Sequence, residues 1–309
     1  MLSTLAKGVS TNVVLTTFRK QLVDLYELTK PRITTLVLVT TFVGMWVASS
    51  GSVNFQLVLF TLLGTGLASA SSATFNNFID RKIDARMSRT RNRPLPSGRV
   101  SAKSAFVFAT LLGIFAFVIL STFTNYLTAW LALFTIFFYV VIYTIWLKRY
   151  STLCTEVGGI AGALPPVIGW TAVTNEITWP ALLLFLIIFL WQPPHFWALA
   201  LVRADEYKKA NIPMLPVIKG TRLTKFRMLL YTIALIPTTI SMYVYGLNGI
   251  TFLLASTLLG IAYLLLTIEF MRKPVTIRSA RRLFSFSILY LLGIFTLVFV
   301  DYQLSAVFM

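Results

Sequence analysis

Three polar residues at the end of an apolar stretch have the types and the spacing of a metal site. Asn76, Asp80 and Asp84 follow one another at intervals of four residues. On an α-helix this interval places all three on one face, with a rise of about 6 Å between neighbours. Two carboxylates and an amide oxygen form an all-oxygen ligand set, which suits Mg²⁺ when water and phosphate complete it. The stripe therefore predicts a magnesium site.

The residues after this stripe are strongly basic. Seven Lys and Arg residues occur between positions 81 and 100, and Arg91 and Arg93 stand directly before the segment Pro94–Gly98. Phosphates are bound by such a combination: carboxylates hold a metal cation, and neighbouring guanidinium groups hold the phosphate anion. The competing interpretation is a solvated helix end whose acids merely pair with nearby arginines, an interaction worth little. Acids close to a membrane core are costly and usually functional, which favours the site.

The composition indicates which elements position these residues. Of the 309 residues, 57% are hydrophobic and 12% are charged, about half the charged fraction of a soluble domain. The apolar residues form runs of about 20, a length that crosses a hydrocarbon core of about 30 Å as a helix. The alternating pattern of outer-membrane barrel strands is missing from the sequence. We therefore predict an all-α fold, a polytopic membrane helical bundle, with residues 1–309 as a single transmembrane domain.

The charge and the rare residues exclude several functions. A net charge of +17 would suggest nucleic acid in a soluble protein, but in a membrane protein positive charge sets topology, so we expect no nucleic-acid partner. Cys154 is the only cysteine and His195 the only histidine. An internal disulfide and a histidine-cluster metal site are therefore excluded.

The length rule for spanning helices predicts nine spans. They cover residues 32–50, 55–78, 104–122, 125–146, 154–173, 179–200, 228–246, 250–270 and 284–303. All 27 Lys and Arg residues then fall in the N-terminal tail and in the loops after spans two, four, six and eight. By the positive-inside rule this side faces the cytoplasm, or a mitochondrial matrix, and the C-terminus lies outside.

Residues 1–30 form an N-terminal tail that contains one helical pattern. Phe18, Leu22, Leu25 and Tyr26 share a face at helical spacing, and Pro31 ends the pattern. We predict a short helix over 18–28 that lies on the inner membrane surface. The short chain and the weak N-terminal signal favour a bacterial inner membrane over a mitochondrial inner membrane.

The stripe and its surroundings resemble the UbiA superfamily of membrane prenyltransferases, whose first metal motif matches Asn76-x-x-x-Asp80-x-x-x-Asp84. The resemblance extends from about residue 28 to 220 and narrows to the haem-using branch through Trp191–Ala200 and Ile212–Val217. The other matching segments are Leu28–Arg32, Asn76–Asp84, Arg91–Gly98 and Tyr143–Arg149. One departure concerns the superfamily's second motif, Asp-x-x-x-Asp, because here Asp205 is followed four residues later by Lys209.

The resemblance implies transfer of a farnesyl group from farnesyl diphosphate to a vinyl group of haem B, with addition of water and release of diphosphate. It implies that Asn76, Asp80, Asp84 and Asp205 are the catalytic residues and hold Mg²⁺, with Glu206 as a further metal ligand. The diphosphate would be gripped by four cationic residues, Arg93, Lys148, Arg149 and Arg203. The other expected partners are membrane lipid and, for the product, haem A synthase or terminal oxidase assembly. The sequence does not define an oligomeric state.

His195 and Trp191 are the predicted haem residues. His195 follows a Pro193-Pro194 break near the end of a span and is flanked by Trp191 and Trp197. An imidazole there suits a porphyrin, either as an iron ligand or as a propionate contact. The competing interpretation is a hydrogen-bonded core histidine.

Two other functions compete with haem farnesylation. A prenyltransferase of quinone synthesis would use an aromatic acceptor, and His195 and Pro213–Pro216 argue against it. A transporter would use broken spans, such as those at Pro165-Pro166 and Pro193-Pro194, as gates. A transporter would also carry its functional charges at the membrane midplane, whereas these acids lie at the span ends.

Overall fold

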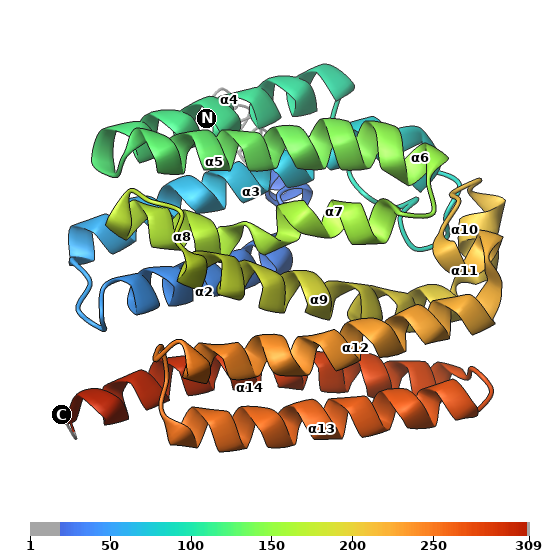
Figure 1. Cartoon of the computed structure of the whole chain (residues 1–309). Helices are drawn as coiled ribbons and strands as arrows, with labels where there is room; N and C mark the ends of the chain where they lie inside the picture. The colour runs from blue at the N-terminus through green and yellow to red at the C-terminus, as the bar shows by residue number, and fades with distance from the viewer. Residues whose placement is uncertain (1–18, 308–309) are drawn as a thin grey trace, which may run out of the picture.

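The computed structural model describes residues 19–307, with side chains described as far as Asp301. Every regular element in this part of the chain is a helix, and the helices run side by side along one direction (Figure 1). After a helical segment at 19–28 come α2 (Pro31–Ala48), α3 (Phe55–Asp84), α4 (Ala102–Phe123), α5 (Tyr126–Phe137), the π-helix η1 (Phe138–Leu147), α6 (Lys148–Tyr150), α7 (Cys154–Ala163), α8 (Pro165–Thr174), α9 (Trp179–Val202), α10 (Ala204–Lys209), α11 (Leu215–Ile218), α12 (Gly220–Val244), α13 (Ile250–Arg272) and α14 (Ile277–Val307).

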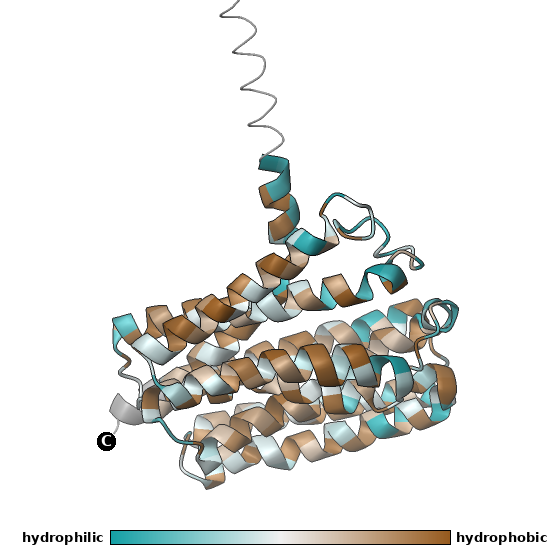
Figure 2. Ribbon diagram, turned by 90° about the horizontal axis from the view of Figure 1, so that it is seen from above, coloured by the Kyte–Doolittle hydropathy of each residue, from teal (hydrophilic) through white to brown (hydrophobic). Residues whose placement is uncertain are grey.

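The predicted membrane bundle is confirmed. Within the described residues, 9 helical segments are long and apolar enough to cross a membrane. Brown, hydrophobic residues predominate along the lengths of the helices in Figure 2, and teal, hydrophilic residues gather near their ends. This distribution is what a hydrocarbon core flanked by polar interfaces requires.

Several helix ends differ from the prediction. Helix α3 continues to Asp84 instead of ending at 78, α12 begins at Gly220 instead of 228, and α14 begins at Ile277 instead of 284. Basic residues predicted in loops therefore stand on helices, among them Arg81 and Arg222. The length rule detects only the stretch that crosses the hydrocarbon, whereas backbone hydrogen bonding continues the helix into the polar interface.

Two spans contain an irregularity: the π-helix of the fourth was not predicted, whereas the break of the fifth at Pro165-Pro166 was. The expected break at Pro193-Pro194 was wrong, because α9 continues through both prolines to Val202. The fourth changes from α5 to a π-helical turn, η1, before it ends in α6. The fifth consists of α7 and α8, which meet at Leu164, directly before Pro165-Pro166. Pro165 and Pro166 have no backbone N–H to donate and clash with the preceding turn, which explains the break between α7 and α8. The π-helical turn is notable because such turns are frequent at functional sites.

Glycine allows α2 and α8 to approach each other very closely. A Cβ atom on Gly169 would lie 1.9 Å from the Thr41 carbonyl oxygen, and one on Gly44 would lie 2.1 Å from that of Pro166. Any side chain at either position would force the two helices apart. Small residues at such crossings are typical of helix packing in membranes.

The helical segment at 19–28 was predicted. Its Leu25 and Leu28 pack against Leu95 and Val100, while Leu22 is exposed. Figure 2 shows this segment projecting from the bundle. Phe18, the first residue of the predicted face, lies outside the described residues, and contact with a membrane surface stays a prediction.

The connections at one end of the bundle carry most of the polar chemistry. Helices α6, α10 and α11 and the segment that joins α3 to α4 all lie at this end in Figure 1, at the right. We call it the basic end, because the Arg-rich residues 85–101 and the basic segment 203–219 belong to it. The last described turn of α14 lies at the opposite end.

The orientation of the basic end is a prediction of the positive-inside rule. A topology reporter fused after Arg91 should report an inner location, and one fused after Asn248 should report an outer location. If both fusions report the same side, the nine-span topology is wrong.

Candidate functional site

A buried carboxylate, Asp80, is the centre of a polar network near the end of α3. The residue is 1% exposed, and its Oδ2 atom accepts hydrogen bonds from Asn76 Nδ2, at 2.9 Å, and from Lys148 Nζ. Its other oxygen, Oδ1, is enclosed and has no hydrogen-bond partner. An enclosed, unpaired carboxylate oxygen is costly unless it receives a donor or a cation.

Asn76 joins three elements through its side-chain amide. Its Oδ1 accepts from Lys30 Nζ at 2.6 Å, and its Nδ2 donates to both Asp80 and Thr144 Oγ1, the latter at 3.1 Å. Thr144 lies in η1 and itself donates to the Tyr139 carbonyl oxygen at 2.8 Å. The π-helical turn thus brings Thr144 against α3, and Lys148 follows directly at its end.

Asp84 lies one turn further along the same face. It is 5% exposed and forms an ion pair with Arg93, whose Nη1 is 2.8 Å from Asp84 Oδ2. The same guanidinium donates to Asn77 Oδ1 at 3.4 Å, while Asn77 Nδ2 donates to the Leu28 carbonyl oxygen at 2.9 Å. These contacts join α3 to the loop that follows it and to the residues that precede α2.

The network contains more positive than negative charge. Lys30, Arg93 and Lys148 contact the stripe that bears Asp80 and Asp84. Burial, together with the nearby Arg93 and Lys148 cations, lowers the pKa of Lys30 to about 7, although the Asp80 and Asp84 carboxylates act in the opposite direction. Cations held this close together repel one another, so an anion that entered between them would be stabilised.

The structure brings together most of the residues predicted from the first motif. Asn76, Asp80 and Asp84 share one face of α3, as the spacing predicted, with Arg93 and Lys148 against them. Arg149 lies beside them and donates to the Ile79 carbonyl oxygen at 3.3 Å. Both acids do pair with cations, as the competing interpretation required, but they are buried, unlike the solvated helix end that it describes.

Within the described residues, no hydrogen bond or ion pair joins the second-motif residues to this network, although Tyr207 of α10 packs in one cluster with Ile83 and Met87 at the end of α3. Asp205 is exposed on α10, and Glu206 has an enclosed Oε2 with no hydrogen-bond partner. Between residues 19 and 301, no cluster of three or more Asp, Glu, His or Cys side chains is placed to hold a metal, and no side-chain hydrogen bond joins Arg203 to Asp80 or Asp84. Roles for Asp205, Glu206 and Arg203 stay predictions.

Sequence reasoning assigned no role to four residues that contact the site. They are Lys30, Asn77, Thr144 and Tyr139. Lys30 stands before Pro31 in a left-handed conformation, with φ of 50°, and its position in the matching segment Leu28–Arg32 was the available signal. Thr144 had the same kind of signal, because it lies in the matching segment Tyr143–Arg149. Tyr139 gave none, because its role depends on the π-helical turn.

A second polar cluster, between α7 and α12, was also missed. Glu156 is 8% exposed and forms an ion pair with Arg227 at 2.7 Å, and the Tyr231 hydroxyl lies 3.5 Å from the same Oε1 atom. Its Oε2 atom is enclosed and unpaired. The available signal was an acid within an apolar span, a feature that usually marks function.

His195 is held between two aromatic rings in the interior of the bundle. Its ring stacks on Trp191 and on Phe284, each with centroids 4.3 Å apart. Its Nδ1 atom lies 2.7 Å from Ser287 Oγ on α14, and Trp191 Nε1 donates to the Ser287 carbonyl oxygen at 2.6 Å. With both ring faces covered, only the edge of the imidazole can meet a ligand.

The Ser287 hydroxyl determines which imidazole nitrogen carries the proton. Ser287 Oγ donates its own hydrogen to the Phe284 carbonyl oxygen at 2.6 Å. It must therefore accept from His195 Nδ1–H, and this assignment rests on the hydrogen-bond network. Nε2 of a neutral ring then carries a lone pair, which suits a metal ion and does not suit a carboxylate.

Membrane-crossing helices with a network of acid, amide and basic side chains at one end are compatible with a polytopic membrane prenyltransferase, and comparison with known proteins shows this class. The model of the UbiA prenyltransferase family matches residues 37–296. The chain belongs to this family, so the transporter interpretation is set aside.

Individual relatives are similar along most of their length. A protein of Gloeobacter violaceus called protoheme IX farnesyltransferase is 46% identical over 278 residues, 90% of this chain and 91% of the relative. Protoheme IX farnesyltransferase 1 of Shewanella woodyi is 47% identical over 281 residues, 90% and 92% of the two chains. The solved structure of a UbiA homolog from Archaeoglobus fulgidus, bound to DMAPP and Mg²⁺, has a TM-score of 0.61 at 16% identity and covers 87% of this chain and 98% of that one.

Proposed function

We propose that this chain is a haem O synthase, which transfers a farnesyl group from farnesyl diphosphate to a vinyl group of haem B. Water is added in the same reaction, which gives haem O and releases diphosphate. The names and the extent of the relatives described above support the two substrates. The observation that carries the proposal is the buried network of Asp80, Asn76 and Lys148, which combines metal-ligand oxygens with a cation for phosphate.

The first part of the proposal is a magnesium site. The enclosed, unpaired Oδ1 of Asp80 fits a hard cation. Asp84 and the Asn76 amide supply further oxygens on the same face, which Arg93 and Lys30 occupy in this structure. Asp205 would add a ligand from α10, with Glu206 beside it. Mg²⁺ bound here would neutralise the charge that develops on the leaving diphosphate. The fold relative from Archaeoglobus fulgidus was solved with this metal and a prenyl diphosphate.

The second part is a grip on the diphosphate. Lys148 and Arg93 face the stripe, Arg149 lies beside it, and Lys30 joins them from the residue before α2. We include Arg203 from the predicted set. Cations that are already positioned stabilise charge as it forms on phosphate oxygens without further reorganisation.

The third part is the haem contact, where the structure favours one of the two predicted modes. A propionate would need an N–H donor, whereas Nε2 of His195 carries a lone pair when Nδ1–H is bonded to Ser287. We therefore propose iron ligation through Nε2, with Trp191 and Phe284 fixing the plane of the ring. Trp191 thus acts as a positioning residue.

The proposed reaction needs only farnesyl diphosphate, haem B and water as reactants. The allylic carbon–oxygen bond of farnesyl diphosphate breaks, and both electrons leave with diphosphate. The vinyl group of haem B forms the new carbon–carbon bond, and water captures the resulting cation and loses a proton. A site closed to bulk water protects the allylic cation from early capture.

We also propose that the basic end lies in the cytoplasm of a bacterium, and that haem O passes to haem A synthase or to terminal oxidase assembly.

The purified protein, given haem B, farnesyl diphosphate and Mg²⁺, should form a product with the mass of haem B plus a farnesyl group and a hydroxyl group. Asp80→Asn and Asp84→Asn should each lower turnover more than about a hundredfold, since even residues that merely support metal ligands contribute about 10- to 100-fold. Asp205→Asn should lower turnover, and Glu206→Gln should lower it less.

Asp24→Asn is the matched control, because Asp24 also pairs with an arginine, Arg99, but lies outside the network. It should retain wild-type turnover. Prenylation of an aromatic quinone precursor in place of haem B would establish the alternative acceptor, and near-wild-type turnover of Asp80→Asn at saturating Mg²⁺ would refute the metal assignment.

The haem contact is tested separately through His195. His195→Ala should shift the absorption spectrum of bound haem B and weaken haem binding, while affinity for a farnesyl diphosphate analogue stays unchanged. Ser287→Ala, which keeps the ring but removes the Nδ1 acceptor, should cause a smaller shift of the same kind. Equal loss of both affinities, or no change in either, contradicts the proposed role of His195.

A further inference from the structure

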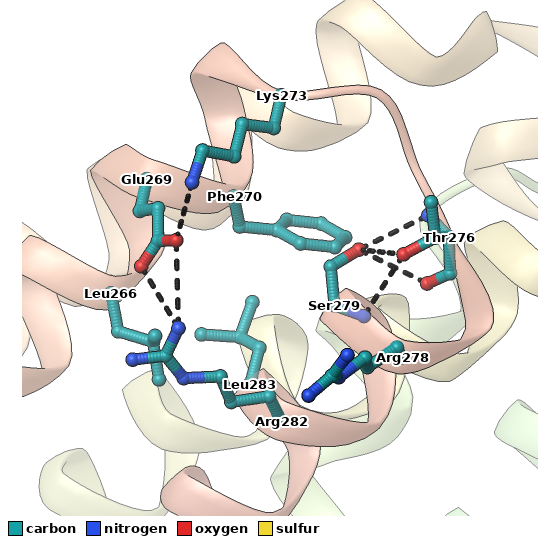
Figure 3. Close-up of a pocket in the computed structure, with 9 residues that line it drawn as sticks. All are labelled: Leu266, Glu269, Phe270, Lys273, Thr276, Arg278, Ser279, Arg282 and Leu283. Atoms are coloured by element: carbon teal, nitrogen blue, oxygen red, sulfur yellow. Dashed lines mark hydrogen bonds and ion pairs between the residues drawn. The ribbon is translucent and has the colours of Figure 1, made fainter.

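A cationic cavity lies at the turn between α13 and α14, distinct from the network around Asp80. It measures about 220 Å³, and its polar lining includes Glu269, Lys273, Arg278 and Arg282 (Figure 3). Glu269 accepts from Lys273 Nζ at 2.8 Å and lies 3.3 Å from Arg282 Nη1. Figure 3 shows these two cations on either side of the carboxylate.

The charge of this cavity is unbalanced. Three cations line it against one carboxylate, and Arg278 forms no ion pair within the described part of the chain. The Thr276 and Ser279 hydroxyls are engaged with each other and with the turn at the start of α14. Recognition of an anion therefore depends on Arg278, Arg282 and Lys273, all of which are exposed.

An apolar groove continues from the cavity along the two helices. It measures about 560 Å³ and is lined by Leu265, Phe286 and Leu289 among others, and it shares Leu266, Glu269 and Arg282 with the cavity. Leu265 is 61% exposed and Leu289 57% exposed, and both stand within membrane-crossing helices. A polar cavity at a helix end thus opens into an apolar groove that faces lipid.

We propose that this cavity and groove bind an anionic phospholipid. The phosphate of the headgroup contacts Arg278 and Arg282, and one acyl chain lies in the groove between α13 and α14. Basic pockets between membrane helices at the cytoplasmic interface are suited to such headgroups. The apolar groove favours a lipid over a free phosphate ion, because the ion has no apolar part that could contact Leu265 or Leu289. Glu269 holds Lys273 and Arg282 in place and also weakens the attraction for an anion.

The proposal is tested by native mass spectrometry of the full-length protein in detergent. Phosphatidylglycerol and phosphatidylcholine with identical acyl chains are added in equal amounts, and the lipid retained on the protein is measured. The wild type should retain phosphatidylglycerol preferentially. Arg278→Gln, which breaks no described ion pair, should lower this preference about fivefold, the effect of one cation near the surface.

Arg222→Gln is the matched control, because Arg222 is exposed near the start of α12, at the same end of the bundle, and lies outside the cavity. It should leave the preference unchanged, whereas Glu269→Gln should raise it by removing the only carboxylate of the cavity. Inorganic phosphate should not displace the lipid. Equal retention of both lipids by the wild type, equal losses in Arg278→Gln and Arg222→Gln, or displacement by inorganic phosphate would overturn the proposal.

Discussion

The carboxylate of Asp80 must be neutralised where it is buried, and the site is organised by this constraint. Removing one ionised group from water costs several kcal/mol, so such a group persists only with a close counter-charge and hydrogen bonds. Here Lys148 supplies the counter-charge and Asn76 the hydrogen bond. Asn76 can direct its amide hydrogens to Asp80 because its oxygen is occupied by Lys30. Residues from three membrane spans and their ends are thereby held at one carboxylate.

This arrangement connects the irregularities of the fold to the chemistry. The π-helical turn at the end of the fourth span places Thr144 and Lys148 against α3. The bond from Asn77 to Leu28 joins α3 to the chain just before α2, where Lys30 lies. The ion pair between Arg93 and Asp84 holds the loop after α3 against the end of that helix. The cations that compensate the carboxylates are also the groups that we propose contact the diphosphate, so in this proposal fold stability and substrate binding rely on the same side chains.

The sequence was sufficient for the features that depend on local pattern. Run lengths predicted the nine spans, because crossing a hydrocarbon core sets a minimum apolar length. The four-residue spacing of Asn76, Asp80 and Asp84 predicted their common face, because helix geometry alone determines it. His195 was singled out as the only histidine.

The remaining features depend on packing between distant segments. The role of Lys30 follows from contact between residues 46 positions apart, which no local pattern contains. The π-helical turn leaves no clear composition signal, and the Glu156–Arg227 pair joins two spans separated by 71 residues. The Nδ1–H tautomer of His195 depends on Ser287, which lies 92 residues further along the chain. The spatial relation of Asp205 to the first motif likewise lies beyond what spacing can determine.

The central claim is that the network around Asp80 receives the metal and the diphosphate. An experimental structure with Mg²⁺ and a non-hydrolysable farnesyl thiodiphosphate tests it most directly. We predict Mg²⁺ at about 2.0–2.1 Å from an Asp80 oxygen, the distance this ion requires, with Asp84 or Asn76 also in contact and with Lys148 and Arg93 on phosphate oxygens. A diphosphate bound elsewhere, with Lys148 still paired to Asp80 and no metal beside it, would contradict this account.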